Sequence, residues 1–193
     1  MRRSLTLTLC SVLLVAACGQ AGSGAVTTDV REVGDFDRLD ISGGVNVDLV
    51  VDTSAETRVA VIYDDNLQDN VVTRLDGDTL VIETQGNINV TGRDRRVEVT
   101  VPALAEMTVD SGSNVNGEGA LSSLVLGVTG GANVDLGDLE VVDMDIDVDS
   151  GANVGVNVTN SITGQASGGA NLTIGGDPAT RNVDSSGGAN VSS

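Results

Sequence analysis

The amino-acid sequence predicts an all-β fold, a single-domain parallel β-helix or β-solenoid with rungs of about 19 residues. A unit of the form Ser/Gly-Gly-Ala/Ser-Asn-Val/Leu recurs in the second half of the chain, with its Asn at positions 114, 133, 153, 171 and 190. Between these units, apolar and polar residues alternate with the period of two that is typical of strands. Aromatic residues make up only 1% of the chain, so we expect a core of thin aliphatic layers.

The first residues of the chain indicate export. A basic start, MRR, precedes an apolar run over residues 5–17, which is shorter than the roughly 20 residues that a membrane span needs. This pattern is typical of a signal peptide. The run ends in VAACG (residues 15–19), which resembles the bacterial lipobox, in which small residues precede a lipidated Cys. We therefore expect a lipoprotein signal peptide over 1–17 and a lipid at Cys18; the alternative is an ordinary secretory signal with Cys18 incidental.

The mature chain should then consist of a short link and one domain. Residues 18–29 are small and polar, which predicts a lipidated Cys followed by a flexible tether. Residues 30–193 form the predicted β-solenoid domain. Cys10 lies in the removed segment, so a lipidated Cys18 leaves no thiol for a disulfide. We expect an exported, membrane-anchored lipoprotein, placed in the outer membrane if the source is Gram-negative, since Gly19 is compatible with that sorting.

The repeated Asn residues define a column that should run through the whole domain. Weaker copies of the repeat pattern surround two earlier Asn residues, and an insertion is expected near residues 92–96. Stacked amides can hydrogen-bond from rung to rung, and both Gly and Asn tolerate left-handed backbone. We therefore predict a structural turn ladder, with a row of ligand contacts as the alternative. Its members are Asn46, Asn87, Asn114, Asn133, Asn153, Asn171 and Asn190.

An apolar column should follow the Asn column. The residue after each repeated Asn is Val115, Val134, Val154, Leu172 or Val191. If rungs stack at roughly 4.8 Å, these side chains form one continuous ladder, and eight rungs make a rod on the order of 40 Å long. A single rung cannot bury its own inner face, so its stability must come from its neighbours.

Three stretches together resemble a known bacterial family. They are REVGDFDRLDISGGVNVDLV (31–50), TRVAVIYDDNLQDNVVTRLDGDTLVIE (57–83) and VEVTVPALAEMTVDSGSNV (97–115), followed by the SGGAN-type turns. In this order they resemble the auto-transporter adhesin, head GIN domain family over about residues 30–193. The resemblance implies a β-helical fold, frequent export or lipid anchoring, and no established catalytic residues.

Charge and composition exclude several classes of function. The formal net charge is −18 and all ten basic residues are Arg, which argues against a nucleic-acid binder because phosphate neutralisation needs clustered cations. The sequence has no His and no Lys, which excludes His-based triads, Schiff-base lysines and typical zinc sites. We expect no catalytic residues and no enzyme. A polysaccharide-active enzyme that uses two carboxylates is the less favoured alternative.

One acidic strand suggests a cation as a secondary hypothesis. Residues 130–138 (GGANVDLGD) partly match the nonapeptide of calcium-binding β-rolls. The carboxylates of Asp143, Asp145, Asp147 and Asp149 should share one face, where they offer oxygen ligands to calcium. The alternative is a solvated acidic face that discourages aggregation between strand edges. No other cofactor is expected.

The sequence therefore favours a non-enzymatic envelope lipoprotein that displays a rigid acidic rod as an adhesin, scaffold or interaction module. A calcium or small-ligand binding module is the alternative. The expected partners are the membrane, through Cys18, and a protein or glycan at the cell surface. The last rung lacks an evident polar cap, which adds the hypothesis of an end-to-end homodimer.

Overall fold

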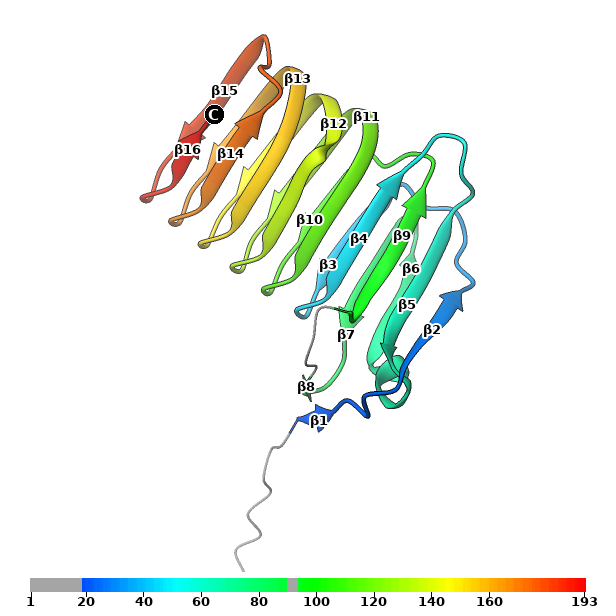
Figure 1. The fold of residues 1–193 in the computed structure, drawn as a ribbon. Helices are drawn as coiled ribbons and strands as arrows, with labels where there is room; N and C mark the ends of the chain where they lie inside the picture. Colours follow the sequence, from blue (N-terminus) through cyan, green and yellow to red (C-terminus); the bar gives the residue numbers. More distant parts are fainter. Residues whose placement is uncertain (1–18, 90–93) are drawn as a thin grey trace, which may run out of the picture.

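A computed structural model of the chain describes residues 19–89 and 94–193. In this range the chain forms sixteen β-strands and one short 3-10 helix, η1, so the all-β prediction is confirmed (Figure 1). The expected signal peptide and Cys18 lie outside the described residues. The elements are β1 (Gln20–Ala21), β2 (Val26–Arg31), β3 (Arg38–Ser42), β4 (Asn46–Val51), β5 (Arg58–Asp64), η1 (Asp65–Asn70), β6 (Val71–Asp76), β7 (Thr79–Thr84), β8 (Ile88–Asn89), β9 (Arg96–Val101), β10 (Glu106–Val109), β11 (Asn114–Val128), β12 (Asn133–Val148), β13 (Asn153–Ala166), β14 (Asn171–Gly175), β15 (Thr180–Ser185) and β16 (Asn190–Ser192).

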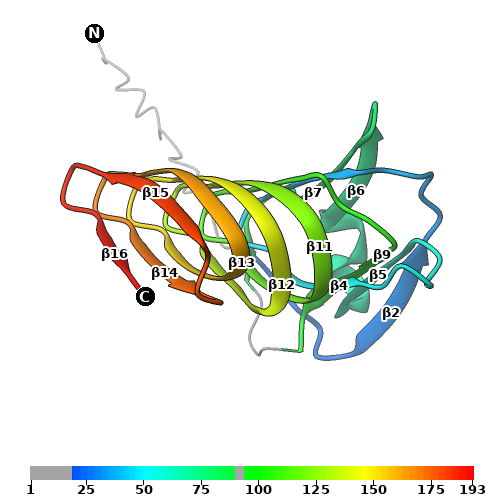
Figure 2. The same cartoon turned by 90° about the horizontal axis from the view of Figure 1, so that it is seen from above.

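The strands from β10 onward pair in parallel, each with the equivalent strand of the next repeat. The long strands β11, β12 and β13 curve around the molecule, so that one strand contributes to two walls (Figure 2). The start of β11 pairs with β4, for example, whereas its end pairs with β10. The result is a large, nearly closed sheet around an aliphatic core.

Tight four-residue turns join the two walls at one edge. In the turn 129–132, the N–H of Ala132 donates to the carbonyl of Thr129 at 3.1 Å. Its two central residues, Gly130 and Gly131, have φ values of 61° and 74°, as a type I′ turn requires. Ser111 takes the first central position in an earlier turn, with φ 58°. Gly and Ser therefore carry the left-handed backbone, and the expectation that the repeated Asn shares this role is wrong. Each Asn instead begins the following strand.

The core follows the predicted alternation. Val115, Val134, Val154 and Leu172 are buried and pair in register across neighbouring strands. Val191 continues this column at the open end, where it is only partly buried. The two aromatic side chains are both in the N-terminal region, where Phe36 and Tyr63 join the same core.

The N-terminal region is built differently. Strand β5 is antiparallel to both β2 and β9, and β6 is antiparallel to β7. The expectation of a parallel solenoid over all of 30–193 is therefore wrong for this region. Helix η1 links β5 to β6, and its Leu67 is fully buried in the core. These elements cover the end of the core that lies opposite β16 (Figure 1).

The spatial order of strands also departs from the chain order. The unit β3–β4 lies between β7–β9 on one side and β10–β11 on the other. The expected columns hold for β7, where Leu80 pairs with Leu39 and Ile82 with Ile41. On the other wall, however, the strand beside β4 on this side is β9, and not the segment around Asn87 that the column predicts. The insertion expected near 92–96 falls at the end of the connection from β7 to β9, and residues 90–93 of this connection lie outside the described range.

The predicted tether is fixed for most of its length. Strand β1 pairs with β8, and β2 pairs with β5 along its full length. Between them, the N–H of Gly24 donates to Asp64 at 2.6 Å. The Asp64 carboxylate is fully buried and accepts two hydrogen bonds from Arg95, at 2.8 and 2.9 Å. The prediction of flexibility is therefore wrong for residues 20–21 and 26–29, because strand pairing holds them.

Candidate functional site: a polar trough across the strands

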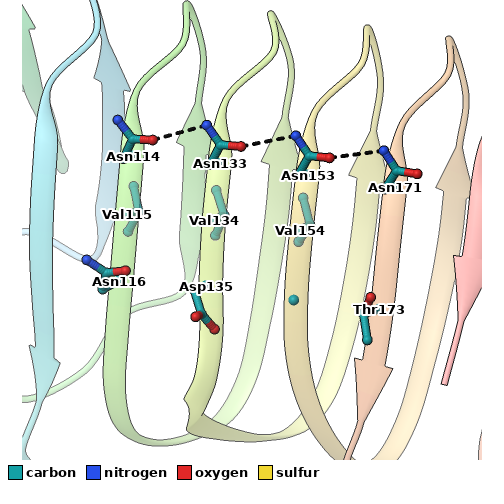
Figure 3. A pocket seen from close by; sticks show the side chains of 11 residues that line it. Asn114, Val115, Asn116, Asn133, Val134, Asp135, Asn153, Val154, Asn171 and Thr173 are labelled. Atoms are coloured by element: carbon teal, nitrogen blue, oxygen red, sulfur yellow. Dashed lines mark hydrogen bonds between the residues drawn. The ribbon is translucent and has the colours of Figure 1, made fainter.

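The amides of the repeated Asn residues form a hydrogen-bonded row on the outer face of one wall (Figure 3). Each Nδ2 group donates to the Oδ1 of the Asn on the preceding strand in space. The donor–acceptor distances are 2.9 Å from Asn114 to Asn46, 3.1 Å from Asn133 to Asn114, 3.0 Å from Asn153 to Asn133 and 3.0 Å from Asn171 to Asn153. We call these five residues the Asn row. Its spacing is set by the strand spacing of the sheet.

Two predicted members stand apart from these bonds. Asn87 lies in the connection after β7, where its carbonyl accepts a hydrogen bond from the Gln20 N–H at 2.7 Å. Next to Asn46, the expected place of Asn87 is taken by β9, and Asn46 Nδ2 donates to the Arg95 carbonyl at 2.9 Å. Including Asn87 in the column is therefore wrong. Asn190 pairs in register with Asn171 on the last strand.

A second column runs parallel to the Asn row, two residues further along each strand. Its members are Asp48, Asn116, Asp135, Gly155, Thr173 and Ser192, which pair in register. Between the two columns lies a shallow trough of about 460 Å³ over β11 to β14. It continues as a hollow of about 500 Å³ beside Asp48 and Arg96. Sequence reasoning named the Asn row but missed this second column, although the alternation of period two places it on the same face.

The charge on the trough changes along its length. At the β4–β9 end, Arg96 contacts Asp48 at 3.0 Å and Glu98 at 2.6 Å. From β11 to β14 the polar lining groups are amides, a hydroxyl and one carboxylate, that of Asp135. The lining is completed by Val115, Val134, Val154 and Gly155. This part of the trough is therefore close to neutral, in a protein whose formal net charge is −18.

The acidic strand expected to favour calcium lies on the other wall. Asp145 and Asp147 are exposed there, whereas Asp143 and Asp149 are half-buried. Asp143 accepts hydrogen bonds from Ser161 and Asn160, and these bonds lower its pKa. Within residues 19–89 and 94–193, no group of three or more His, Cys, Asp or Glu side chains is placed to hold a metal ion. A calcium site at these residues stays a prediction.

The turns carry a further carboxylate network. Asp149 accepts hydrogen bonds from the Ser167 hydroxyl at 2.8 Å and from the Ser150 N–H at 2.6 Å. Asp110 likewise accepts from the Thr129 hydroxyl at 2.9 Å. These bonds lower the pKa of both carboxyl groups. They join the turn at Asp110 to the turn at Thr129, and the turn at Asp149 to the turn at Ser167. These acids therefore support the fold, and the trough remains the best candidate for contact with a ligand.

The fold and the trough define an all-β repeat protein with an extended polar face. Residues 35–123 and 105–178 match the family described as "Putative auto-transporter adhesin, head GIN domain". The chain belongs to this family, and the resemblance noted from the sequence is confirmed. Comparison with curated proteins finds no match.

Solved structures share the fold. A "putative adhesin" from Bacteroides fragilis aligns with a TM-score of 0.53 at 16% identity, covering 90% of this chain and 99% of the other. A "putative adhesin" from Parabacteroides distasonis aligns with a TM-score of 0.50 at 15% identity, covering 91% of this chain and 100% of the other. At these identities the likeness is one of fold. In the part of this chain that the structure describes, no helix is long and apolar enough to cross a membrane.

Proposed function

We propose that the protein is a non-enzymatic lipoprotein of the cell envelope that presents a rigid, acidic β-solenoid as an adhesin or scaffold. In this proposal residues 106–192 stack as rungs of about 19 residues. The in-register parallel pairing of Asn114, Asn133, Asn153, Asn171 and Asn190 supports it. Membership of an adhesin-like family supports a role at the cell surface.

The polar trough is the feature that best supports a binding function. It combines a row of exposed amides with a second polar column, over a length of at least four strands. Amides and hydroxyls recognise partners by hydrogen bonds. They lack the basicity of a general base, and the trough over β11 to β14 contains one carboxylate, that of Asp135, where glycoside cleavage would need two. The geometry therefore suits binding along a surface better than catalysis at a point.

Retention of envelope material by the immobilised domain tests this function. Residues 19–193 are coupled to beads and exposed to envelope fragments of the source bacterium or of neighbouring species. The variant Asn133→Arg/Asn153→Arg fills the trough and should abolish retention. The variant Val125→Arg/Thr163→Arg adds the same charge to exposed positions of the opposite wall and should retain as much as the native domain. Equal retention by the two variants would remove the trough from the proposal.

The anchor is tested separately. If Cys18 carries the lipid, the native protein should partition into the detergent phase of a membrane extract, and Cys18→Ala should move it to the aqueous phase. The rod would then be fixed close to the membrane, because Gln20 already donates its N–H to the Asn87 carbonyl. Aqueous partitioning of the native protein would exclude lipid anchoring while leaving the trough unaffected.

A further inference from the structure

The Asn row has hydrogen-bonding capacity that the fold does not use. A side-chain amide offers two N–H donors and two acceptor lone pairs on its oxygen. Asn133 and Asn153 each donate once and accept once within the row. One donor and one acceptor per residue therefore remain on this exposed face, repeated at the strand spacing of roughly 4.8 Å.

Gly155 leaves the trough open, although neither its backbone conformation nor the space around it requires a glycine. It sits inside β13, in register with Asp135 on one side and Thr173 on the other. Its φ is not in the left-handed region, unlike that of the turn glycines. A Cβ atom placed on it would meet nothing closer than Asp135 Oδ1 at 3.7 Å. Gly weakens a strand interior, and its presence there often marks a place where another molecule approaches the backbone.

The charges around this hollow limit what can occupy it. Asp135 is the one carboxylate among the groups that line the trough over β11 to β14. An anionic polymer would be repelled by the protein as a whole, and a cationic polymer would be drawn to the acidic opposite wall. An uncharged ligand with many hydroxyl groups fits the amides, the Thr173 hydroxyl and the partly exposed backbone at Gly155.

We propose that the trough binds an extended, uncharged polysaccharide that lies across strands β11 to β14, along the axis of the rod. Its hydroxyl groups accept from and donate to the spare amide groups of the Asn row, while the sugar rings approach the backbone at Gly155. This inference names the ligand class of the site on which the proposed function rests. Since the repeat of donors spans four strands, or about 14 Å between the first and the last, affinity should rise with oligosaccharide length and level off once the trough is filled.

Gly155→Thr is the sharpest test, because it should separate binding from stability. Thr matches the residue at the same position of β14, and strands favour β-branched side chains. The variant should therefore melt at the same temperature as the native domain or higher. It should bind a neutral β-linked glucan oligomer at least tenfold more weakly, as measured by calorimetric titration. Gly127→Thr is the matched control, because Gly127 lies in a strand of the opposite wall and a Cβ there would meet Thr108 Cγ2 at an ordinary 3.5 Å; it should not change the affinity.

A second variant probes the row itself. Asn133→Ala/Asn153→Ala should lower the affinity about tenfold, as expected for the loss of two hydrogen bonds to a ligand. Thr163→Ala/Gln165→Ala on the opposite wall should leave it unchanged. Absence of binding to neutral oligosaccharides of every length would overturn the proposal. So would tighter binding of a cationic chitosan oligomer of the same length.

The two proposals can fail separately. If envelope retention needs the trough but disappears when the envelope is treated with protease, the partner is a protein and the polysaccharide assignment is wrong, while the proposed function stands. If retention and oligosaccharide binding both persist in Asn133→Arg/Asn153→Arg, the trough itself is wrong. Retention lost on treatment with a glycosidase, together with weaker binding by Gly155→Thr, supports both.

Discussion

The N-terminal region (residues 19–101) and the C-terminal region (residues 106–192) bury the same kind of aliphatic column by different means. In the C-terminal region, each strand pairs in parallel with its counterpart one repeat away. In the N-terminal region, antiparallel strands, η1 and a buried ion pair cover one end of the core. Within a stack of repeats, each repeat buries the apolar side chains of its neighbours. The end of the stack lacks such a neighbour and needs other elements to cover it.

Removing a core side chain from each region should show this difference most strongly. Leu67→Ala should lower the free energy of unfolding by roughly 2–5 kcal/mol, because Leu67 is fully buried where the end of the core is covered. Leu172→Ala, near the open end, should mainly loosen β14 to β16. Urea unfolding followed by circular dichroism gives the first value, and hydrogen exchange locates the second. If both variants lose protection from hydrogen exchange uniformly along the chain, the two regions do not differ in the way proposed.

The buried ion pair should produce the next largest effect, and one that depends on pH. The hydrogen bond from Arg95 lowers the pKa of the fully buried Asp64 carboxyl. Because the folded pKa lies below the unfolded value of about 3.9, ionised Asp64 stabilises the folded protein at any pH above that value. This stabilisation is lost as the pH falls through the folded pKa. Asp64→Asn should therefore lower the melting temperature at pH 7 and reduce its fall below about pH 4.

The matched control for Asp64 is Asp143→Asn. The pKa of Asp143 is also lowered, by hydrogen bonds from Ser161 and Asn160, but this carboxylate is only half-buried on the outer wall. Its replacement should change the melting temperature less at every pH. If the two variants give the same pH profile, the ion pair has no special part in holding the segment around Gly24 against the end of β5.

Replacing Arg181 should have the smallest effect on stability, but it should change the tendency of the protein to dimerise. Arg181 occupies the column of Leu124, Met144 and Ile162, which are buried core residues. It also donates to the Ser192 carbonyl at 2.8 Å, across the two edge strands. Charge at an inward position of an edge strand opposes pairing with another strand. Arg181→Ile should therefore promote the end-to-end dimer predicted from the sequence.

Light scattering after size exclusion measures this effect. Arg181→Ile should dimerise at a lower concentration than the native protein, with little change in melting temperature. Thr180→Ile adds the same side chain to the neighbouring exposed position on β15 and should not. Dimerisation of both variants would point to added hydrophobicity rather than to the inward column.

The sequence predicts the two regions unequally, for a physical reason. In the repeats, the turn residues, the Asn row and the apolar column recur at a nearly fixed interval, so local pattern predicts the register next to the turns. It does not predict the bulges within β11 to β13, where the register shifts after Asn116 and after Leu136. In the N-terminal region, the partners of β4 and β5 are chosen by long-range pairing. Leu80 and Ile82 follow the expected columns, but Asn87 does not, because the connection between β7 and β9 leaves the pattern. Gly155 was missed since the absence of a side chain becomes informative only when its surroundings are known.

The position of β3–β4 between two later units sets the order in which the chain can fold as it emerges N-terminus first. When residue 51 has emerged, both neighbours of β3–β4 are still to come. The pairing of β4 with β9 is complete only at residue 101, and its pairing with β11 only at residue 119. Every subsequent repeat, in contrast, finds its template already in place. Assembly should therefore wait on the first hundred or so residues and then proceed repeat by repeat, with each type I′ turn delivering the next Asn to the end of the growing row.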